Sequence, residues 1–380
     1  MVVAQLEPAT VVMKRITTVG TVIAIGIAAH TVLNLQRLRK PNAQVPPVDE
    51  LVSVLIPARD EERVIAAALA SVLSQAGIPK LEVIVLDDNS TDETSAVVNS
   101  IADGRVQLMS NTEDPPGNWL GKSWACSLLA DKASGSVLVF MDSDVELSPD
   151  AIRASVRALR ANDFALISPY PRQLAAHWLG RLTQPLVTWS WCALLPLQWA
   201  ERSTRPSLAA ANGQFLVMDA HAYRAVGGHA SVATAVLEDV ALMRAFKNAG
   251  LRTCTMDGSD LASCEMYESA DQTVDGYAKS LWAAFGTPIG SIGVNALLFV
   301  AFIAPPLAAI TTRSATVRAV GALGYAAGTF SRTVVARRMG TRVWPDSALH
   351  PASVSAFIAI NAISWRRHLQ GSNTWKGRAV

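Results

Sequence analysis

Between residues 51 and 160 the sequence alternates short apolar runs with segments of helical periodicity, and this alternation constrains the fold more than any other feature. The apolar runs have the length of buried strands and cover Leu51–Ile56, Leu81–Leu86, Val106–Met109 and Ser136–Met141. The helical segments that follow them cover Glu61–Gln75, Asp92–Ile101, Lys122–Lys132 and Pro149–Arg160. This spacing predicts an α/β domain built on a mostly parallel sheet with helices on both faces.

Acidic clusters follow three of these four strands. They are Arg59-Asp60-Glu61-Glu62, Asp87-Asp88 and Asp142-Ser143-Asp144. The carboxyl ends of parallel strands meet at one edge of a sheet, where the ligands of such sheets bind. Carboxylates gathered there repel one another unless a cation or hydrogen-bond donors lie between them. The sequence therefore predicts a ligand site at this edge.

Asp142 and Asp144 form the sharpest motif of the three clusters. They stand at positions i and i+2 on a turn after the apolar strand Val137–Met141, so both carboxylates can reach one cation. Mg²⁺ and Mn²⁺ prefer oxygen ligands and complete their shell with substrate phosphates. We therefore expect a divalent metal (Mg²⁺ or Mn²⁺) on Asp142 and Asp144.

Several sequence blocks resemble the family 2 glycosyltransferases, whose catalytic domain has the Rossmann-like GT-A fold. The blocks are Val52–Glu62, Leu86–Thr94, Val139–Val145, Gly117–Ala125, Asn212–Leu216, Gly227-Gly228-His229 and Thr374–Arg378. The resemblance extends to the bacterial membrane members that act on isoprenoid lipids, namely the hopanoid-biosynthesis-associated and the diaponeurosporenoate (carotenoid) glycosyltransferases. It implies transfer of a sugar from a nucleotide sugar.

The resemblance also implies a donor site. Pro57, Ala58, Arg59 and Glu61 would line the pocket for the base and ribose. Asp88, with Asp87 beside it, would accept a hydrogen bond from the uracil N3–H. Asp142 and Asp144 would hold the metal on the diphosphate. The chain departs from the family at Asp60, where asparagine is usual.

Two further segments are candidates for donor contacts. Lys122 lies in a turn that opens a helix, where the helix N-terminus and the ammonium together suit a phosphate. A solvated helix residue is the alternative for Lys122. Gly213 and Gln214 precede the apolar run Phe215–Met218, and the resemblance implies that they lie near the acceptor or the sugar.

An inverting transfer needs a base that takes the proton of the acceptor hydroxyl. Leu237-Glu238-Asp239 matches the family's acidic pair, which implies that Asp239 is the base and that Glu238 orients or tunes it. An acidic first turn favoured by the helix dipole is the alternative. Processive members carry a Q-x-x-R-W motif, whereas residues 271–280 contain Gln272 without the Arg-Trp pair. A single transfer is therefore expected, with Lys279 as a candidate for the missing cation.

Long apolar stretches lie at both ends of the chain. Ile16–Leu35, Ile292–Thr311 and Val317–Val335 each have about the length that spans roughly 30 Å of hydrocarbon as a helix. A cleaved signal peptide is the alternative for the first stretch, but that stretch is long and no small-residue cleavage site precedes its basic flank. We expect an anchor and Pro-rich linker at 1–45, a catalytic domain at 46–287 and a membrane region at 288–380.

His177–Ala200 contains four tryptophans among apolar residues. Tryptophan prefers the membrane–water boundary, and Pro185 and Pro196 are expected to break the segment into short pieces. We therefore predict interfacial helices near residues 173–200. Burial in the protein core is the alternative.

Use of a cytosolic sugar nucleotide places residues 41–287 inside the cell, in an enzyme of the inner (plasma) membrane that crosses the bilayer several times. The basic cluster Arg337-Arg338-Arg342 then also lies inside, as the positive-inside rule expects. Pro351–Trp365 is short for a span, so we expect it to lie in the interface or re-enter, with a fourth span as the alternative. Lys376 and Arg378 would then be cytosolic and able to approach the diphosphate or the acceptor headgroup.

Composition narrows the function further. The formal net charge is only +2, so a nucleic-acid partner is not expected. The four cysteines form no metal-like or redox-like pair and are expected to be buried thiols. The sequence predicts an inverting, non-processive, metal-dependent transferase acting from a UDP-sugar onto an isoprenoid, carotenoid or glycolipid acceptor. A polyprenyl-phosphate glycosyltransferase and a non-catalytic membrane scaffold that binds sugar nucleotides are the alternatives.

Overall fold

A computed structural model describes residues 6–376, 378 and 379. The chain divides into two compact units. The catalytic unit comprises residues 38–174, 196–266 and the C-terminal segment from 374, and the helical unit comprises the N-terminal segment to 37 with residues 175–195 and 267–373. The sequence predicted these divisions at 45/46 and 287/288 instead, without the return of the C-terminal segment to the catalytic unit.

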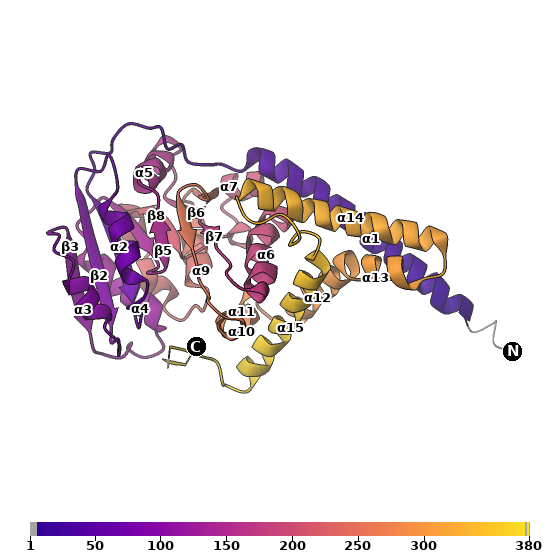
Figure 1. The fold of residues 1–380 in the computed structure, drawn as a ribbon. Coiled ribbons are helices and arrows are strands. Elements are labelled where there is room, and N and C mark those ends of the chain that lie inside the picture. Colours follow the sequence, from indigo (N-terminus) through magenta and orange to yellow (C-terminus); the bar gives the residue numbers. More distant parts are fainter. Residues whose placement is uncertain (1–5, 377, 380) are drawn as a thin grey trace. The chain divides into compact units, whose positions relative to one another are not determined.

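A seven-stranded sheet forms the centre of the catalytic unit (Figure 1). Its order is β3-β2-β1-β4-β8-β6-β9. The strands are β1 (Val52–Ala58), β2 (Leu81–Asp88), β3 (Val106–Asn111), β4 (Val137–Met141), β6 (Leu166–Tyr170), β8 (Phe215–Asp219) and β9 (Thr253–Asp257). Only β8 runs antiparallel to its neighbours β4 and β6. The predicted mostly parallel α/β sheet is confirmed.

Alternate residues of each strand pack against opposite helical layers, because side chains alternate across a sheet with period two. Val54 and Ile56 of β1 join the core formed with α2 (Ile65–Leu73), α3 (Thr94–Asn99) and α5 (Ala151–Ala161). Leu55 joins the core on the other face, formed with α4 (Gly121–Lys132), α8 (Ala220–Ala225) and α9 (Glu238–Asn248). All three strand residues are fully buried. Burial on both faces explains why these strands are continuously apolar.

Smaller elements complete the catalytic unit. A three-stranded sheet has the order β5-β10-β7. The remaining elements are β5 (Val145–Leu147), β7 (Arg172–Gln173), β10 (Ala262–Cys264), α7 (Leu197–Arg202) and two 3-10 helices, η2 (Pro206–Leu208) and η3 (Gly228–Val232). A hairpin of β11 (Thr374–Trp375) and β12 (Arg378–Ala379) follows the last helix of the chain.

The helical unit contains α1 (Leu6–Arg37), α6 (Trp178–Leu194), α10 (Ala270–Ala278), α11 (Leu281–Ala284), α12 (Pro288–Phe302), α13 (Ala304–Thr311), α14 (Ala315–Arg338) and α15 (His350–Leu369). Helix α1 packs along α14, and Thr21 Oγ1 donates to the carbonyl of Val320 at 3.0 Å. A Cβ at Gly20 would lie 1.9 Å from the Val300 carbonyl oxygen. Glycine therefore permits a close approach of two helix backbones, as in helix packing within membranes.

Helix α6 differs from the prediction in two ways. It runs through Pro185 without interruption, because a single missing N–H costs one hydrogen bond and the rest of the helix remains packed. Trp189 and Trp191 are buried, which matches the core alternative for these two residues. Trp178 and Trp199 are 65% and 70% exposed, as an interfacial position requires.

Two helical segments of the described chain, Val11–Arg37 and Pro288–Thr311, are long and apolar enough to cross a bilayer by length and composition. In the most apolar stretch of each segment, only 33% and 28% of the residues are buried, respectively. Helix α14 covers the predicted span Val317–Val335 but falls outside this pair, since arginines and small residues lower its hydropathy. Helix α15 has 20 residues rather than the predicted fifteen, because it begins one residue before Pro351, at His350, and continues four residues past Trp365 to Leu369.

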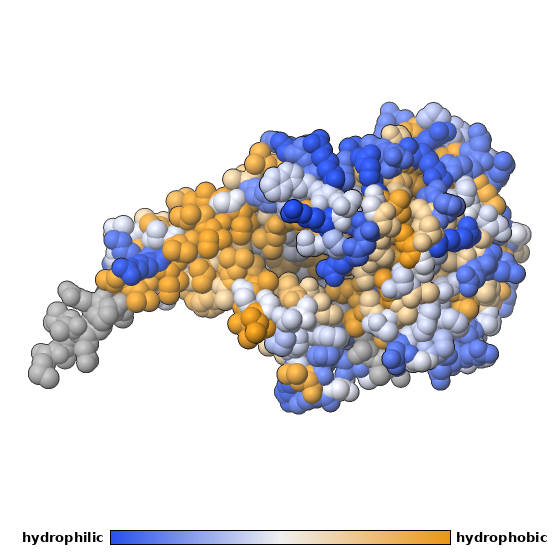
Figure 2. All heavy atoms as spheres, turned by 180° about the vertical axis from the view of Figure 1, so that it is seen from behind, coloured by the Kyte–Doolittle hydropathy of each residue, from blue (hydrophilic) through white to orange (hydrophobic). Residues whose placement is uncertain are grey.

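A large part of the helical unit's face seen in Figure 2 is apolar. Exposed residues of this unit include Val19, Val22, Ile289, Ile292, Phe299, Ile310 and Leu323. Contiguous apolar surface of this kind marks a site for a membrane or a partner protein.

Candidate active site

The carboxyl edge of the main sheet collects most of the predicted site residues. Arg59 and Glu61 follow β1, Asp87 and Asp88 end β2, and Asp142 follows β4. Since β8 runs antiparallel, its amino end reaches the same edge. The Asp142 N–H accordingly donates to the carbonyl of Gln214 at 3.2 Å. The first turns of α4 and α9 bring Lys122, Glu238 and Asp239 to the same place.

Lys122 links the two aspartates predicted to bind the metal with the acidic pair Glu238-Asp239, which contains the predicted catalytic base. Its Nζ lies 2.7 Å from Asp142 Oδ1 and 3.0 Å from Glu238 Oε1. Burial alone would lower the pKa of the ammonium, but the charges of Asp142 and Glu238 outweigh burial and raise that pKa well above its usual value. The ammonium is therefore charged at neutral pH, and 39% of the side chain remains exposed. Lys122 thus combines two ion pairs with a partly solvated side chain, and its role at a phosphate stays a prediction.

Asp144 is a carboxylate suited to a cation. Its Oδ1 is buried and has no hydrogen-bond partner among the described residues. Burial, followed by the charges of Asp142 and Glu61, raises its pKa to about 7. An unpartnered buried carboxylate oxygen is costly unless a cation or a donor satisfies it. The donor set at Asp142 and Asp144 therefore fits a hard divalent metal.

Substrate oxygens would have to complete the shell of such a metal. Within the described chain, no cluster of three His, Cys, Asp or Glu residues is arranged to hold an ion. Mg²⁺ and Mn²⁺ sites built on one or two carboxylates use phosphates in this way.

The pKa values of Asp239 and Glu238 are shifted in opposite directions although the two residues are adjacent. Burial, with the charge of Glu238, raises the pKa of Asp239 to about 7. Burial also opposes ionisation of Glu238, but the Lys122 ammonium outweighs it and lowers the pKa of Glu238. Asp239 Oδ2 accepts from the Gly213 N–H at 2.8 Å, and Oδ1 accepts from the Val240 N–H at 2.7 Å. These bonds fix the carboxylate while its raised pKa suits a group that takes a proton near neutral pH.

Gly213 and Gln214 support the site in different ways. A Cβ at Gly213 would lie 3.2 Å from Lys122 Nζ and 3.3 Å from Glu238 Oε1, so glycine leaves room for that ion pair. The Gln214 side chain is 2% exposed. Its Oε1 accepts from Gln173 at 2.8 Å, and its Nε2 contacts Cys264 Sγ at 2.9 Å. The Gln214 amide thus ties β8 to β7 and β10.

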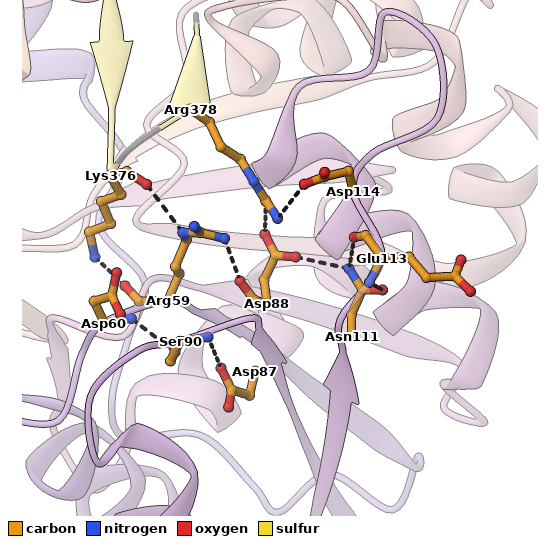
Figure 3. Close-up of polar contacts among 10 residues, drawn as sticks. All are labelled: Arg59, Asp60, Asp87, Asp88, Ser90, Asn111, Glu113, Asp114, Lys376 and Arg378. Atoms are coloured by element: carbon orange, nitrogen blue, oxygen red, sulfur yellow. Dashed lines mark hydrogen bonds and ion pairs between the residues drawn. The ribbon is translucent and has the colours of Figure 1, made fainter.

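Asp87 and Asp88 are both buried but have different partners. Asp87 accepts from the Ser90 N–H at 3.0 Å and from the Ser95 hydroxyl, so it holds the turn between β2 and α3. Asp88 Oδ1 accepts from Asn111 Nδ2 at 2.9 Å, across the register of β2 and β3 (Figure 3). Asn111 is thus a residue of the candidate site that the sequence did not predict.

The turn after β1 explains the departure at Asp60. Asp60 has φ of +52°, in the left-handed region that asparagine and aspartate tolerate better than other non-glycine residues. Its Oδ1 accepts from the Thr91 N–H at 2.7 Å. Aspartate therefore replaces asparagine here without loss of the turn. Ala58 is buried and Pro57 is partly exposed at the end of β1.

The C-terminal hairpin also reaches this edge, which the sequence prediction only partly anticipated. Arg378 pairs with Asp88, and Lys376 Nζ lies 2.5 Å from Glu61 Oε1. Lys376 and Arg378 thus contact carboxylates of the predicted base and ribose pocket. Gln272 and Lys279 belong to the helical unit, so their candidacy stays a prediction.

A mostly parallel sheet with an aspartate pair, a lysine and an acidic helix start at its carboxyl edge is the arrangement expected of a GT-A type glycosyltransferase. A mannosyltransferase from Pyrobaculum calidifontis, solved with GDP-mannose and Mn²⁺, shares the fold. The TM-score is 0.55 at 16% identity, over 94% of this chain and 99% of that one.

Sequence comparison gives the family. Residues 53–205 match the family described as glycosyl transferase family 2. The chain is 31% identical to a 4,4'-diaponeurosporenoate glycosyltransferase of Staphylococcus haemolyticus over 234 residues, which is 60% of each protein. It is 27% identical to the Staphylococcus aureus protein of that name over 337 residues, 86% of this chain and 87% of the relative. The chain therefore carries a glycosyl transferase family 2 domain over residues 53–205, in the GT-A fold.

Proposed function

We propose that this enzyme is an inverting, non-processive, metal-dependent transferase that moves one sugar from a UDP-sugar to an isoprenoid, carotenoid or glycolipid acceptor. The observation that carries the proposal is Lys122, which bridges Asp142 of the aspartate pair and Glu238 beside the candidate base. One ammonium thus connects the group that would hold the diphosphate with the neighbour of the group that would activate the acceptor.

In the proposed reaction the acceptor oxygen forms a bond to the anomeric carbon while the bond from that carbon to the diphosphate breaks. Asp239 takes the proton of the acceptor hydroxyl, and UDP leaves with the bonding electrons. Lys122 lies where it can stabilise the negative charge that develops on the leaving diphosphate. A divalent metal bound at Asp142 and Asp144 would supply further neutralisation of that charge.

The acceptor decides whether a base is needed. A lipid hydroxyl carries a proton at pH 7 and requires Asp239, whereas a lipid carboxylate is already ionised. The Staphylococcus relatives are named for diaponeurosporenoate, a carboxylate. Replacement of Asp239 therefore separates the two acceptor chemistries, because only transfer to a hydroxyl should become slow.

We propose that the enzyme acts at the cytosolic face of the cell membrane. The two apolar segments, Val11–Arg37 and Pro288–Thr311, leave most of their surface exposed, unlike core helices of a soluble protein. The contacts of Lys376 and Arg378 with the catalytic unit require the C-terminal hairpin to lie on the same side of the bilayer as that unit. That requirement favours an interfacial or re-entrant α15 over a fourth span.

The direct test uses membranes from cells that express the wild type or Asp142→Asn/Asp144→Asn. The membranes are incubated with labelled UDP-glucose and Mn²⁺, and the lipid extract is analysed by mass spectrometry. A labelled lipid that depends on both aspartates supports the proposal. A product cleaved by mild acid would identify a polyprenyl-phosphate sugar instead. Nucleotide binding without UDP release, with every lipid extract offered, would leave only the scaffold alternative.

A further inference from the structure

The strands β11 (Thr374–Trp375) and β12 (Arg378–Ala379) form a strap on the catalytic unit, far along the sequence from the residues that they contact. Its contacts join residues 290 to 317 positions apart. Figure 3 shows Lys376 and Arg378 side by side with Arg59 and Asp88 at the end of the sheet. The strap therefore lies at the predicted base and ribose pocket rather than at the predicted diphosphate site.

Lys376 is held in place by reciprocal hydrogen bonds. Its Nζ donates to the Arg59 carbonyl at 2.6 Å and lies 2.5 Å from Glu61 Oε1. In return, Arg59 Nε donates to the Lys376 carbonyl at 3.2 Å. Lys376 adopts a left-handed conformation with φ of +46°, which is uncommon for lysine. A non-glycine residue in this region persists only where its surroundings hold it.

Arg378 meets the carboxylate predicted to read the nucleobase. Its Nη1 pairs with Asp88 Oδ2, while Asn111 occupies Oδ1 of the same carboxylate. The Arg378 side chain is 18% exposed. Its Nη2 is buried, has no hydrogen-bond partner among the described residues, and lies 3.6 Å from Asp114 Oδ1. Nη2 of Arg378 therefore makes an ion pair but no hydrogen bond among the described residues.

The charges at this edge require such cations. Six carboxylates lie at this edge, and the proposed ligand, a nucleoside diphosphate, is itself anionic; they are Glu61, Asp88, Asp142, Asp144, Glu238 and Asp239. Without compensation the carboxylates at the base and ribose end would repel that ligand. Lys122 compensates at the diphosphate end. Lys376 and Arg378 compensate at the base and ribose end.

We propose that the strap is a component of the donor site, in which Arg378 positions Asp88 for the nucleobase and Lys376 positions Glu61 and the Arg59 turn for the ribose. This inference rests on the proposed use of a nucleotide sugar. Arg378 and Lys376 are then positioning residues. They act through Asp88 at the end of β2 and through Arg59 and Glu61 after β1. The opposite arrangement, in which the strap occupies the pocket and must leave before the donor binds, is an outcome of the test.

The first experiment measures binding of UDP with Mn²⁺ to the full-length protein in detergent by calorimetry, and the donor KM and kcat. Arg378→Ala should raise the UDP dissociation constant about tenfold or more, the scale of one lost charged hydrogen bond. The donor KM should rise with it, while kcat stays near that of the wild type. Arg378→Lys should be intermediate, because it keeps the charge but not the fork geometry.

Arg105→Ala is the matched control. Arg105 pairs with Asp103 at 2.7 Å before β3, at the opposite edge of the same sheet, so UDP affinity should not change. Unchanged or tighter UDP binding by Arg378→Ala would overturn the inference. A wild type that binds neither UDP nor GDP would overturn the proposed function together with it.

The second experiment does not depend on the arginine variant. Thr374→Cys places an exposed thiol on the strap, while the four native cysteines are buried. If the strap stays in place when the donor binds, UDP with Mn²⁺ should not speed labelling of this thiol by a maleimide. Labelling that becomes faster with UDP would show that the strap leaves the site when the donor binds, and would overturn the inference.

Discussion

Asp239 should control the acidic limb of the pH–rate profile. Burial and the Glu238 charge raise its pKa to about 7, while Lys122 and the N–H groups of Gly213 and Val240 lower it. A carboxylate acts as a base only when it is ionised, so activity should rise with pH through this value. The value of kcat/KM reports the free enzyme, in which these contacts are formed.

The magnitude follows from the ionised fraction. With a pKa of about 7, roughly one Asp239 in eleven is ionised at pH 6 and roughly ten in eleven at pH 8. For a hydroxyl acceptor, kcat/KM should therefore fall about tenfold from pH 8 to pH 6. Asp239→Asn should abolish this limb, slow turnover by about 10²-fold or more, and leave UDP affinity near normal.

The assay follows UDP release with a lipid extract as acceptor, at low donor concentration and saturating Mn²⁺. Glu238→Gln provides a second variant with a predicted sign. Loss of the Glu238 charge removes a cause that raises the Asp239 pKa, so the limb should move to lower pH. A flat wild-type profile between pH 6 and 8, or an Asp239→Asn enzyme that keeps the limb, would refute the assignment of Asp239 as the base.

Four further changes have defined outcomes. Asp144→Asn should remove the Mn²⁺ dependence of UDP binding without lowering thermal stability, and a variant whose UDP affinity still falls on addition of EDTA as in the wild type would contradict the metal assignment. Lys122→Met should weaken UDP binding about tenfold through loss of a charged contact, measured by calorimetry; unchanged affinity would argue against a diphosphate role. Cysteine at Ser372, probed on intact cells with an impermeant thiol reagent, should stay unlabelled, and labelling from outside would overturn the topology. Leu55→Ala should lower the free energy of unfolding by about 2–5 kcal/mol in urea titrations, because Leu55 is fully buried, whereas Leu174→Ala, at an exposed leucine, should change it little.

The sheet and its acidic edge could be predicted because short-range patterns determine them. Four apolar runs gave four strands within a few residues of their observed bounds. Parallel pairing then brings Asp88 and Asp142 to one edge whatever the details of the loops. Gly213 and Gln214 could be added to the predicted site because they precede the apolar run that forms β8. The sequence did not show that β8 is antiparallel.

Contacts between distant residues could not be predicted in this way. Asn111 reaches Asp88 only through the register of β2 and β3. Trp189 is buried because its indole N–H donates to Ser331 at 2.8 Å and its ring packs on Phe302, both from other helices of the helical unit. Tryptophan composition alone did not distinguish this core position from an interfacial one.

The strap also has a consequence for the order of synthesis. Arg378 meets a partner 290 residues earlier, and most of the helical unit is encoded between them. At about 5–20 residues per second, a ribosome needs roughly 15–60 s to make that interval. During this time the sheet can form, but the proposed donor pocket lacks the two cations of the strap. A growing chain should therefore gain high affinity for sugar nucleotides only after its apolar helices have been made, so that donor binding follows synthesis of the helical unit.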